Sequence, residues 1–475
     1  MARDLGPLMA VAIVVGTVIG SGIFKKPQPI AQNIPYFGLM ALCWILGGLL
    51  VFLGALAYAE VVTLHPRAGG NYVFLREGYG RLAGFLWGWV EFFVIRAASL
   101  AALATIFTSS LASMLSEFVP WLAGEEGFWA QRFITVAVIL GLGLVNVRGV
   151  RWGGGLQLAI TIVKVASLLG LFALPFVVAV LGSRSSVIKP GNLTPAFPEL
   201  PQWNWVLLGK FGSAFLGVLW AYHGWMNLAP VAEEVRDPQR NLWRSLLLGT
   251  LIIIVLYLSV NLAYALVLSQ QELAEMKETV AIGFCRLLLG PAGATLAAAA
   301  IMCSVFGALN GNLLVGPRLL YAMGQDGLAP KMLADVHDRY RTPAGAIMVM
   351  AGWSSVLVLA VGLLIQVGVL DPKKDAFDVL TDFAMFGAVI FETMAVLSIF
   401  IFRWTMPDAE RPYRCPGYPI VPLLYVLLPA FILVNMFLHQ RQEALIGAGF
   451  ILVGVVVYRQ IGETRPSSPP ETEES

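Results

Sequence analysis

The first long apolar segment of the chain contains the stretch Gly16-Thr17-Val18-Ile19-Gly20-Ser21-Gly22-Ile23-Phe24. Two glycines around a serine, at a depth where a membrane helix is normally continuous, permit two interpretations. They form a small-residue face that lets another helix approach closely, or they interrupt the helix so that its freed backbone lines a cavity. The stretch alone favours neither interpretation.

The composition indicates a membrane protein. Of the 475 residues, 58% are hydrophobic and only 13% are charged, whereas about 25% of residues are charged in an average soluble domain. A net charge of +2 argues against a nucleic-acid partner, which needs a basic patch. The four cysteines are scattered without a CxxC pair, so we expect no disulfide framework, no metal site and no cofactor.

Twelve segments are apolar and long enough to cross a bilayer as helices of about 20 residues. They are Leu5–Gln32, Phe37–Leu64, Leu82–Leu115, Arg132–Val147, Gly154–Leu181, Trp205–Ala232, Leu242–Leu268, Gly293–Met323, Ala344–Val369, Phe377–Phe402, Ile420–Leu438 and Ala444–Tyr458. Strands of a membrane barrel would instead alternate in segments of about ten residues. The predicted fold class is an all-α polytopic membrane protein.

An even number of spans puts both termini on one side of the membrane. The loops and tail of that side carry 18 of the 31 Lys and Arg residues, the other side carries 11, and Arg96 and Lys164 lie inside spans. Because positive charge accumulates in the cytoplasm, we expect a multi-pass protein of the cell (inner) membrane, in contact with lipid, with both termini cytoplasmic. The polar tail, residues 459–475, is predicted to be disordered.

The sixth span contains a second interruption, Trp220-Ala221-Tyr222-His223-Gly224-Trp225-Met226-Asn227. Gly20 and Gly224 lie one unit of five helices apart. Interrupted spans at corresponding positions of two halves are typical of transporters built from inverted repeats. The pair therefore favours a substrate site over helix packing alone.

Backbone groups that the two breaks leave unpaired predict the kind of ligand that binds there. Amide groups at Gly20–Ile23 lack a partner one turn back and attract an anion such as a carboxylate. Carbonyls near Val18 and Ile19 point the other way and accept from an ammonium group. Together the breaks favour a zwitterion, of which an α-amino acid is the simplest.

Three strings carry a family resemblance: GTVIGSGIF (16–24), WAYHGW (220–225) followed by Glu233-Glu234, and SVFGALNGN (304–312). They resemble the amino acid–polyamine–organocation superfamily, and most of all the prokaryotic, stand-alone form of the L-type amino acid transporter family. The resemblance implies a LeuT-type fold of two inverted five-helix repeats plus two extra helices, with helices 1 and 6 broken. Its units are residues 1–182, 183–402 and 403–458, followed by the tail.

The resemblance also implies how the substrate is held. The amides of residues 21–23 hold its carboxylate, the carbonyls of Val18, Trp220 and His223 hold its amine, and the Trp220 ring caps it. The predicted substrate-binding residues are Val18, Ile19, Gly20, Ser21, Gly22, Ile23, Trp220, Ala221, His223, Gly224 and Asn227.

Lys164 lies about ten residues into the fifth span, near mid-membrane, where a charge is costly and by default functional. One interpretation is a structural lysine bound to helix-end carbonyls. In the family that the chain resembles, a lysine here occupies the place of a sodium ion. We therefore predict transport without sodium.

His223 departs from that family, in which a small residue, most often glycine, stands at this point. Its imidazole narrows the pocket in favour of small side chains, or titrates and makes transport sensitive to pH. A histidine that simply packs in the bundle is the alternative. In the third span, Glu91 and Arg96 are expected to be structural, although five residues is a poor spacing for a pair on one helix.

Four charged residues at the inner helix ends, together with Trp220, are candidate gate residues: Glu60, Arg76, Glu233 and Glu234. Anchoring at the membrane interface explains the four charges equally well. The loop of residues 116–131 lacks the cysteine through which eukaryotic members join a glycoprotein, so no disulfide-linked heavy chain is expected.

The predicted function is sodium-independent transport of neutral L-amino acids by alternating access, as an exchanger, and not an enzymatic activity. A proton-coupled symporter on the same fold is the alternative. A channel needs rings of carbonyls or charges, and an enzyme needs a cluster of His, Asp or Cys, which the four dispersed histidines do not provide. No phosphate-binding loop motif is present for ATP.

Overall fold

The computed structural model describes residues 5–67, 69–148, 153–181, 187–199, 204–340, 342–369 and 376–462. Within these ranges the chain is helical, and its only β contact is a parallel bridge between Leu5 and Val235. Twelve helical segments are long and apolar enough to cross a membrane. The all-α polytopic class is therefore confirmed, whereas the tail from residue 463 onward lies outside the described residues.

The spans follow the predicted order. The first six are α1 (Pro7–Val18) with α2 (Gly22–Lys25), α4 (Phe37–Leu64), α6 (Arg81–Val90) continued by η1 (Glu91–Arg96) and α7 (Ala97–Met114), α9 (Phe128–Val147), α10 (Gly153–Leu181), and α11 (Trp205–Tyr222) with η6 (Trp225–Glu234). The last six are α12 (Pro238–Val267), α14 (Val280–Gln325), α15 (Ala344–Gln366), α16 (Ala376–Thr405), α17 (Ile420–His439) and α18 (Arg441–Gly462).

Short helices connect these spans: α3 (Pro27–Asn33), α5 (Asn71–Tyr79), α8 (Pro120–Ala123), η2 (Glu125–Gly127), η4 (Pro190–Leu193), α13 (Gln270–Ala274) and η7 (Lys331–Leu333). The largest difference from the predicted ends lies in the eighth span, predicted to start at Gly293. In the structure α14 reaches back to Val280 across a kink at Gly290, whose φ of 72° suits glycine. The kink and the following Pro291 explain why the apolar pattern seemed to begin later.

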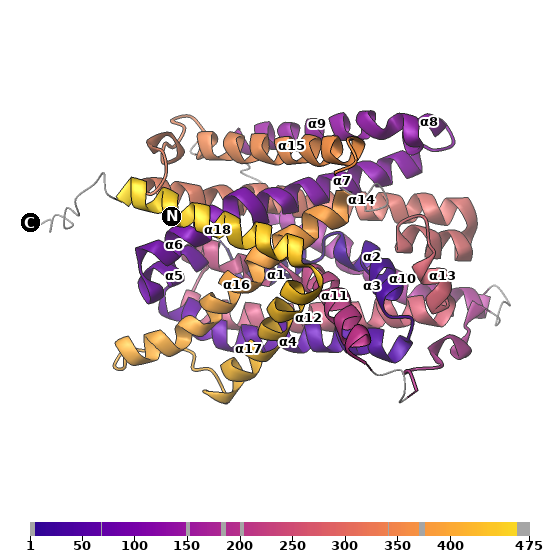
Figure 1. Ribbon diagram of the computed structural model, residues 1–475, viewed down its shortest axis with the longest axis horizontal. Coiled ribbons are helices and arrows are strands. Elements are labelled where there is room, and N and C mark those ends of the chain that lie inside the picture. Colours follow the sequence, from indigo (N-terminus) through magenta and orange to yellow (C-terminus); the bar gives the residue numbers. More distant parts are fainter. Residues whose placement is uncertain are drawn as a thin grey trace, which may run out of the picture.

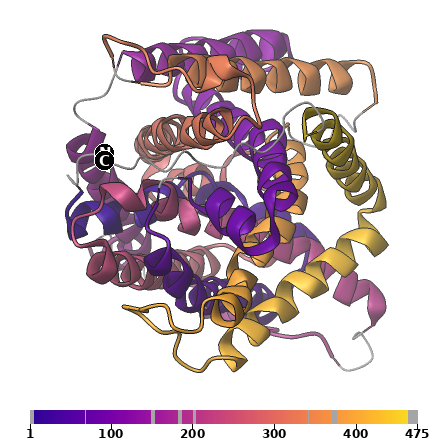
Figure 2. The same cartoon turned by 90° about the vertical axis from the view of Figure 1, so that its left-hand side faces the viewer.

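Burial separates a centre from a periphery. In the third span 83% of the apolar window is buried, against 11% in the last span. In Figure 1, α1 and α11 lie in the middle of the bundle, and α9 and α15 lie side by side at one edge, which Figure 2 also shows from the side. The outer faces of the peripheral helices expose many large hydrophobic side chains.

The first and sixth spans are interrupted where the two glycine-rich stretches lie. α1 ends at Val18 and α2 begins at Gly22, while α11 ends at Tyr222 and η6 begins at Trp225. Two glycines make this geometry possible. A Cβ on Gly22 would lie 2.5 Å from the Cα of Ala221, so the two breaks touch through their backbones, and Gly224 has a φ of 102°.

Candidate functional site

The first break leaves backbone amides exposed to a cavity. The amide of Ile19 still reaches the Val15 carbonyl at 2.9 Å, and the amide of Gly20 turns back to Val18 at 2.7 Å. For the next three amides, of residues 21–23, no acceptor is found among the described residues. The hydroxyl of Ser21, buried at 1% exposure, also lacks a partner. These are the groups predicted to hold a carboxylate.

The second break is tied to the first by two hydroxyl groups. Thr17 Oγ1 lies 3.2 Å from the carbonyl of Gly224, in addition to its shorter bond of 2.7 Å to the Ile13 carbonyl of its own helix. The Tyr257 hydroxyl, from α12, lies 3.1 Å from the carbonyl of Val18 and 3.0 Å from that of Ala221. One phenol group therefore holds both helix ends at a fixed separation.

A central cavity of about 30 Å³ lies between the breaks. Its lining residues are Thr17, Val18, Gly20, Ser21, Gly22, Ser99, Leu103, Trp220, His223, Gly224, Asn227 and Asn312. Ser99, like Ser21, is buried with an unpartnered hydroxyl, so two hydroxyl groups border the cavity without a protein partner. A buried polar group without a partner is costly, and a polar ligand or water can satisfy it here. The space holds only a few waters, so an amino acid requires side chains to move.

The structure gathers most of the predicted site residues around this cavity, but not all of them. Ile19, Ile23 and Ala221 do not line it, and their side chains lie in the core. The carbonyl of Ile19 accepts from Lys164, and that of Val18 accepts from Tyr257 and from Gly20. The prediction that these two carbonyls point freely towards a substrate ammonium group needs correction, because protein donors already occupy them.

Lys164 reaches the first break from α10. Its side chain is fully buried, and Nζ donates to the carbonyls of Gly16 at 2.6 Å and Ile19 at 2.8 Å. Ser304 Oγ, from α14, lies 3.3 Å from the same Ile19 carbonyl. The ammonium group thus pairs with carbonyls at the end of the first half-helix. A structural lysine and a lysine in the place of a sodium ion both require this contact.

A charged network lies beside the cavity. Arg96 Nε donates to Glu91 Oε1 at 2.8 Å, and its other nitrogens bind Asn312 and, at 3.2 Å, Asn227. The five-residue spacing that seemed unsuitable for a pair is explained by η1, a π-helical turn over Glu91–Arg96. A π-helix closes its hydrogen bonds over five residues, which places these two side chains on the same face. The network reaches the site through Asn227 and Asn312.

His223 is paired rather than simply packed. Its Nε2 lies 3.0 Å from Oε1 of Glu392, which comes from α16. Its ring stacks on Trp220, with centroids 6.0 Å apart and planes inclined by 9°. The side chain that departs from the expected glycine is thus fixed on two sides.

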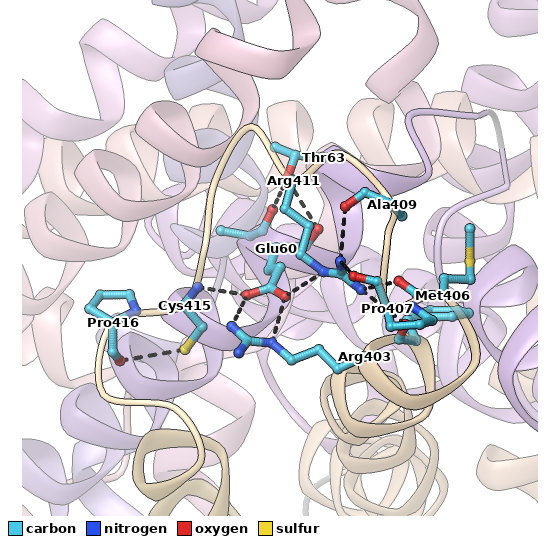
Figure 3. A network of polar contacts seen from close by, with 11 residues as sticks. Glu60, Thr63, Arg403, Met406, Pro407, Ala409, Arg411, Cys415 and Pro416 are labelled. Carbon is cyan, nitrogen blue, oxygen red and sulfur yellow. Dashed lines mark hydrogen bonds and ion pairs between the residues drawn. The ribbon is translucent and has the colours of Figure 1, made fainter.

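Glu60 is the centre of a polar hub (Figure 3). It lies near the end of α4, the second span, and therefore at the end of the bundle where α1, the first span, begins. Its carboxylate accepts from Arg403 Nε at 2.9 Å and Nη2 at 2.8 Å, and from the Cys415 amide at 2.7 Å. Arg411 Nε lies 3.2 Å away as an ion pair without hydrogen-bond geometry. The hub joins α4, α16 and the segment between α16 and α17. Burial, with Glu60 nearby, raises the pKa of the Cys415 thiol to about 11.

The other predicted gate charges form separate contacts at the same end. Arg76 pairs with Asp326 and with Glu77, and Glu234 pairs with Arg318 Nη2 at 2.9 Å. Three of the four candidate gate charges thus have partners on other elements: Glu60 pairs with Arg403, Arg76 with Asp326, and Glu234 with Arg318. A role of these residues as a gate stays a prediction.

Four residues at or beside the site were missed by sequence reasoning: Ser99, Tyr257, Asn312 and Glu392. Glu392 had a usable signal, since a carboxylate inside an apolar span is by default a functional candidate. Tyr257 had a weaker signal, a hydroxyl group within a mainly aliphatic segment. The two remaining residues are ordinary polar side chains of membrane helices, and only the packing brings them to the cavity.

Comparison with known proteins identifies the family. The family model described as amino acid permease matches residues 5–458 of the chain. The chain belongs to this family. This amino acid permease is 30% identical to the serine/threonine exchanger SteT of Bacillus subtilis (strain 168), over 96% of both chains. It is 30% identical to the Asc-type amino acid transporter 1 of Mus musculus, over 96% of this chain and 81% of the relative.

A third relative, the large neutral amino acids transporter small subunit 2 of Homo sapiens, is 31% identical over 96% of this chain and 80% of its own. The resemblance to the amino acid–polyamine–organocation superfamily and to transporters of the L-type is confirmed. The permease is accordingly a multi-pass membrane transporter of amino acids and not an enzyme.

Proposed function

We propose that this permease exchanges neutral L-amino acids across the cell membrane by alternating access, without sodium. The observation that carries the proposal is the run of unpaired amides at residues 21–23, of which Ser21 and Gly22 border the central cavity together with the unpartnered hydroxyls of Ser21 and Ser99. Amides without acceptors favour a carboxylate. The carbonyl of His223, to which no described residue donates, is the acceptor that remains for the amine.

The cavity lining supports a neutral substrate with a small polar side chain. Ser99, Asn227 and Asn312 border it with hydroxyl and amide groups. The charges nearest to it are already paired: Arg96 with Glu91, and His223 with Glu392. A substrate with a charged side chain would find no free counter-charge there, and burying an unpaired charge is costly. The name of the serine/threonine exchanger agrees with this preference.

Lys164 supports independence from sodium. Its ammonium group lies on the carbonyls of Gly16 and Ile19, where a cation would otherwise be needed to neutralise the end of the first half-helix. A fixed positive charge makes a second cation at the same place unfavourable.

The remaining features complete a transport cycle. Two inverted repeats, residues 1–182 and 183–402, alternate around the site, followed by the two helices of residues 403–458. Trp220 covers the substrate. Glu60, Arg76, Glu233 and Glu234 hold the face at which α1 begins, and this face is cytoplasmic, as are both termini. The protein works without a disulfide-linked heavy chain, since none of the four cysteines is fully exposed.

Purified permease in liposomes tests the proposal. Uptake of labelled serine into vesicles loaded with unlabelled serine is expected to exceed uptake into empty vesicles several-fold, equally in sodium and in choline buffers. Uptake that needs a sodium gradient would contradict sodium independence. Equal uptake with and without internal serine would contradict exchange.

Proton-coupled symport is the second candidate, and the His223–Glu392 pair favours it. Histidine exchanges protons near neutral pH, and here it lies at the substrate cavity. The same vesicles distinguish the two functions. An inward proton gradient that drives accumulation into empty vesicles, and that an uncoupler abolishes, is the signature of symport.

A further inference from the structure

Three separate cavities meet at His223. The first is the central cavity between the two breaks. The second, which we call the polar cavity, is bordered by Asn71, Glu91 and Arg96 together with His223 and Glu392. The third, the apolar cavity, also contains His223 and Glu392 in its wall. Each cavity has a volume of about 30 Å³. His223 therefore stands between all three cavities, and Glu392, which borders the polar and apolar ones, holds its imidazole in place.

The pair is held firmly enough to act as a wall. The His223–Glu392 contact of 3.0 Å joins the second break to α16, and the stacked Trp220 ring supports the imidazole from one side. The two side chains keep exposures of 13% and 14%, although both lie in the middle of membrane spans. Their remaining surface faces the internal cavities.

Behind this wall the apolar cavity is lined mainly by aliphatic and aromatic groups. Leu219, Val389 and Tyr425 contribute to it from three different helices. Such a lining matches a large apolar side chain, whose burial is favourable in proportion to its area. The wall separates this lining from the place where a substrate's backbone groups are expected to bind.

We propose that His223 and Glu392 restrict the permease to amino acids with small side chains, and that the apolar cavity is a closed subsite for large neutral ones. The inference rests on the proposed function, because it takes the central cavity as the substrate site. A small side chain needs only a limited movement of the other lining residues, such as Ser99 and Asn312, and the wall stays in place. A leucine or phenylalanine side chain enters the apolar cavity only after the pair separates, and so it is rejected.

Removing the wall tests the proposal as a gain of function. In H223G the central and apolar cavities join, and leucine is expected to compete with labelled serine at a concentration at least about tenfold lower than in the wild type, a range that a side-chain pocket typically provides. E392A removes the partner of the imidazole without altering the break, so that the His223 side chain can turn away, and a gain in the same direction is expected. In E392Q the amide still bonds to the imidazole, so leucine remains excluded.

A second substitution shows whether the gain arises in the apolar cavity. Val389→Phe, placed in H223G, fills the cavity and is expected to return leucine competition to the wild-type level. Leucine-dependent shifts in the unfolding temperature of the purified proteins give an independent measure of binding, so a variant that binds without transporting is still informative.

The outcomes separate this inference from the proposed function. If the wild type exchanges no amino acid, the proposed function fails first. If the wild type exchanges serine but leucine neither competes with nor stabilises H223G or E392A, only the wall is refuted. Equal transport of serine and leucine by the wild type would also overturn it.

Discussion

Replacing Glu60 by glutamine should open the face of the bundle at which α1 begins. The carboxylate is almost completely buried. It accepts hydrogen bonds from Arg403 and from the amide of Cys415, and it forms an ion pair with Arg411. Glutamine has nearly the same shape but no charge, and it offers a donor where the carboxylate offered an acceptor. Both arginines lose their counter-charge, so the α4–α16 connection weakens without a cavity being created.

The magnitude follows from burial. Breaking a fully buried ion pair by removing one partner costs about 3–5 kcal/mol. The Arg403 side chain is 26% exposed, so water screens part of its charge. We therefore expect Glu60→Gln to destabilise the closed state by about 2–3 kcal/mol. If the hub forms only when this face is closed, the equilibrium between closed and open states shifts by about 30- to 150-fold, since 1.4 kcal/mol is a factor of ten.

Cys415 reports the opening. Its thiol is buried next to Glu60, and the raised pKa of about 11 makes the reactive thiolate scarce near neutral pH. In the variant, exposure to water and the loss of the neighbouring charge both lower this pKa towards the ordinary value, so labelling accelerates. A maleimide should react at least about ten times faster in E60Q, in a background without the other three cysteines.

An exposed carboxylate at the same face provides the control. Glu77, whose side chain is 42% exposed, pairs with Arg76, and Glu77→Gln should leave the labelling rate of Cys415 unchanged. Labelling of E60Q at the parental rate, with exchange also unchanged, would refute the hub as a lock and leave Glu60 as an interface anchor.

Three further predictions concern the site itself. Lys164→Met removes the donor from the Gly16 carbonyl and leaves the Ile19 carbonyl only its contact with Ser304, so serine exchange should fall at least about tenfold, and sodium should restore part of it; Lys210→Met, an exposed lysine, is the control. Gly22→Ala places a Cβ within 2.5 Å of the facing backbone and should abolish serine binding measured by thermal shift, whereas Gly141→Ala, with open space around it, should not. Tyr257→Phe removes the hydroxyl that joins the two breaks and should weaken serine binding about 5- to 100-fold; unchanged binding would contradict a bridging role.

Sequence reasoning located the elements because membrane constraints act locally. Length and apolar character define a span wherever it lies in the fold, and a glycine-rich interruption such as Gly20-Ser21-Gly22 is visible in one segment. Lys164 was found for the same reason, since a lysine in an apolar span must have a partner. Its partners, the carbonyls of Gly16 and Ile19, are also the ones that a helix end leaves free.

The parts that sequence reasoning missed depend on contacts between distant segments. Three spans, α12, α14 and α15, lie between those of His223 and Glu392, and only packing shows that the two residues form a pair. The π-helical turn that joins Glu91 to Arg96 has no simple sequence signature, so an ordinary helical spacing was assumed. The candidate gate charges were considered together because they lie at the same end of the bundle. Long side chains at a helix end can pair with several neighbouring elements, and the order of the spans does not specify which one.

The contacts of the two broken helices indicate how the site moves. Tyr257, the Thr17–Gly224 bond and the backbone pairing of Leu5 with Glu234 and Arg236 all join the first span to the sixth. These contacts lie at both breaks and at the helix ends, so we expect the two spans to move as one body. By contrast, α16 is joined to this body by the His223–Glu392 pair and to α4 by the Glu60 hub. Glu392, which we propose limits substrate size, thus lies on the same helix as Arg403 of the Glu60 hub. We therefore expect its separation from His223 to loosen α16 from the broken helices.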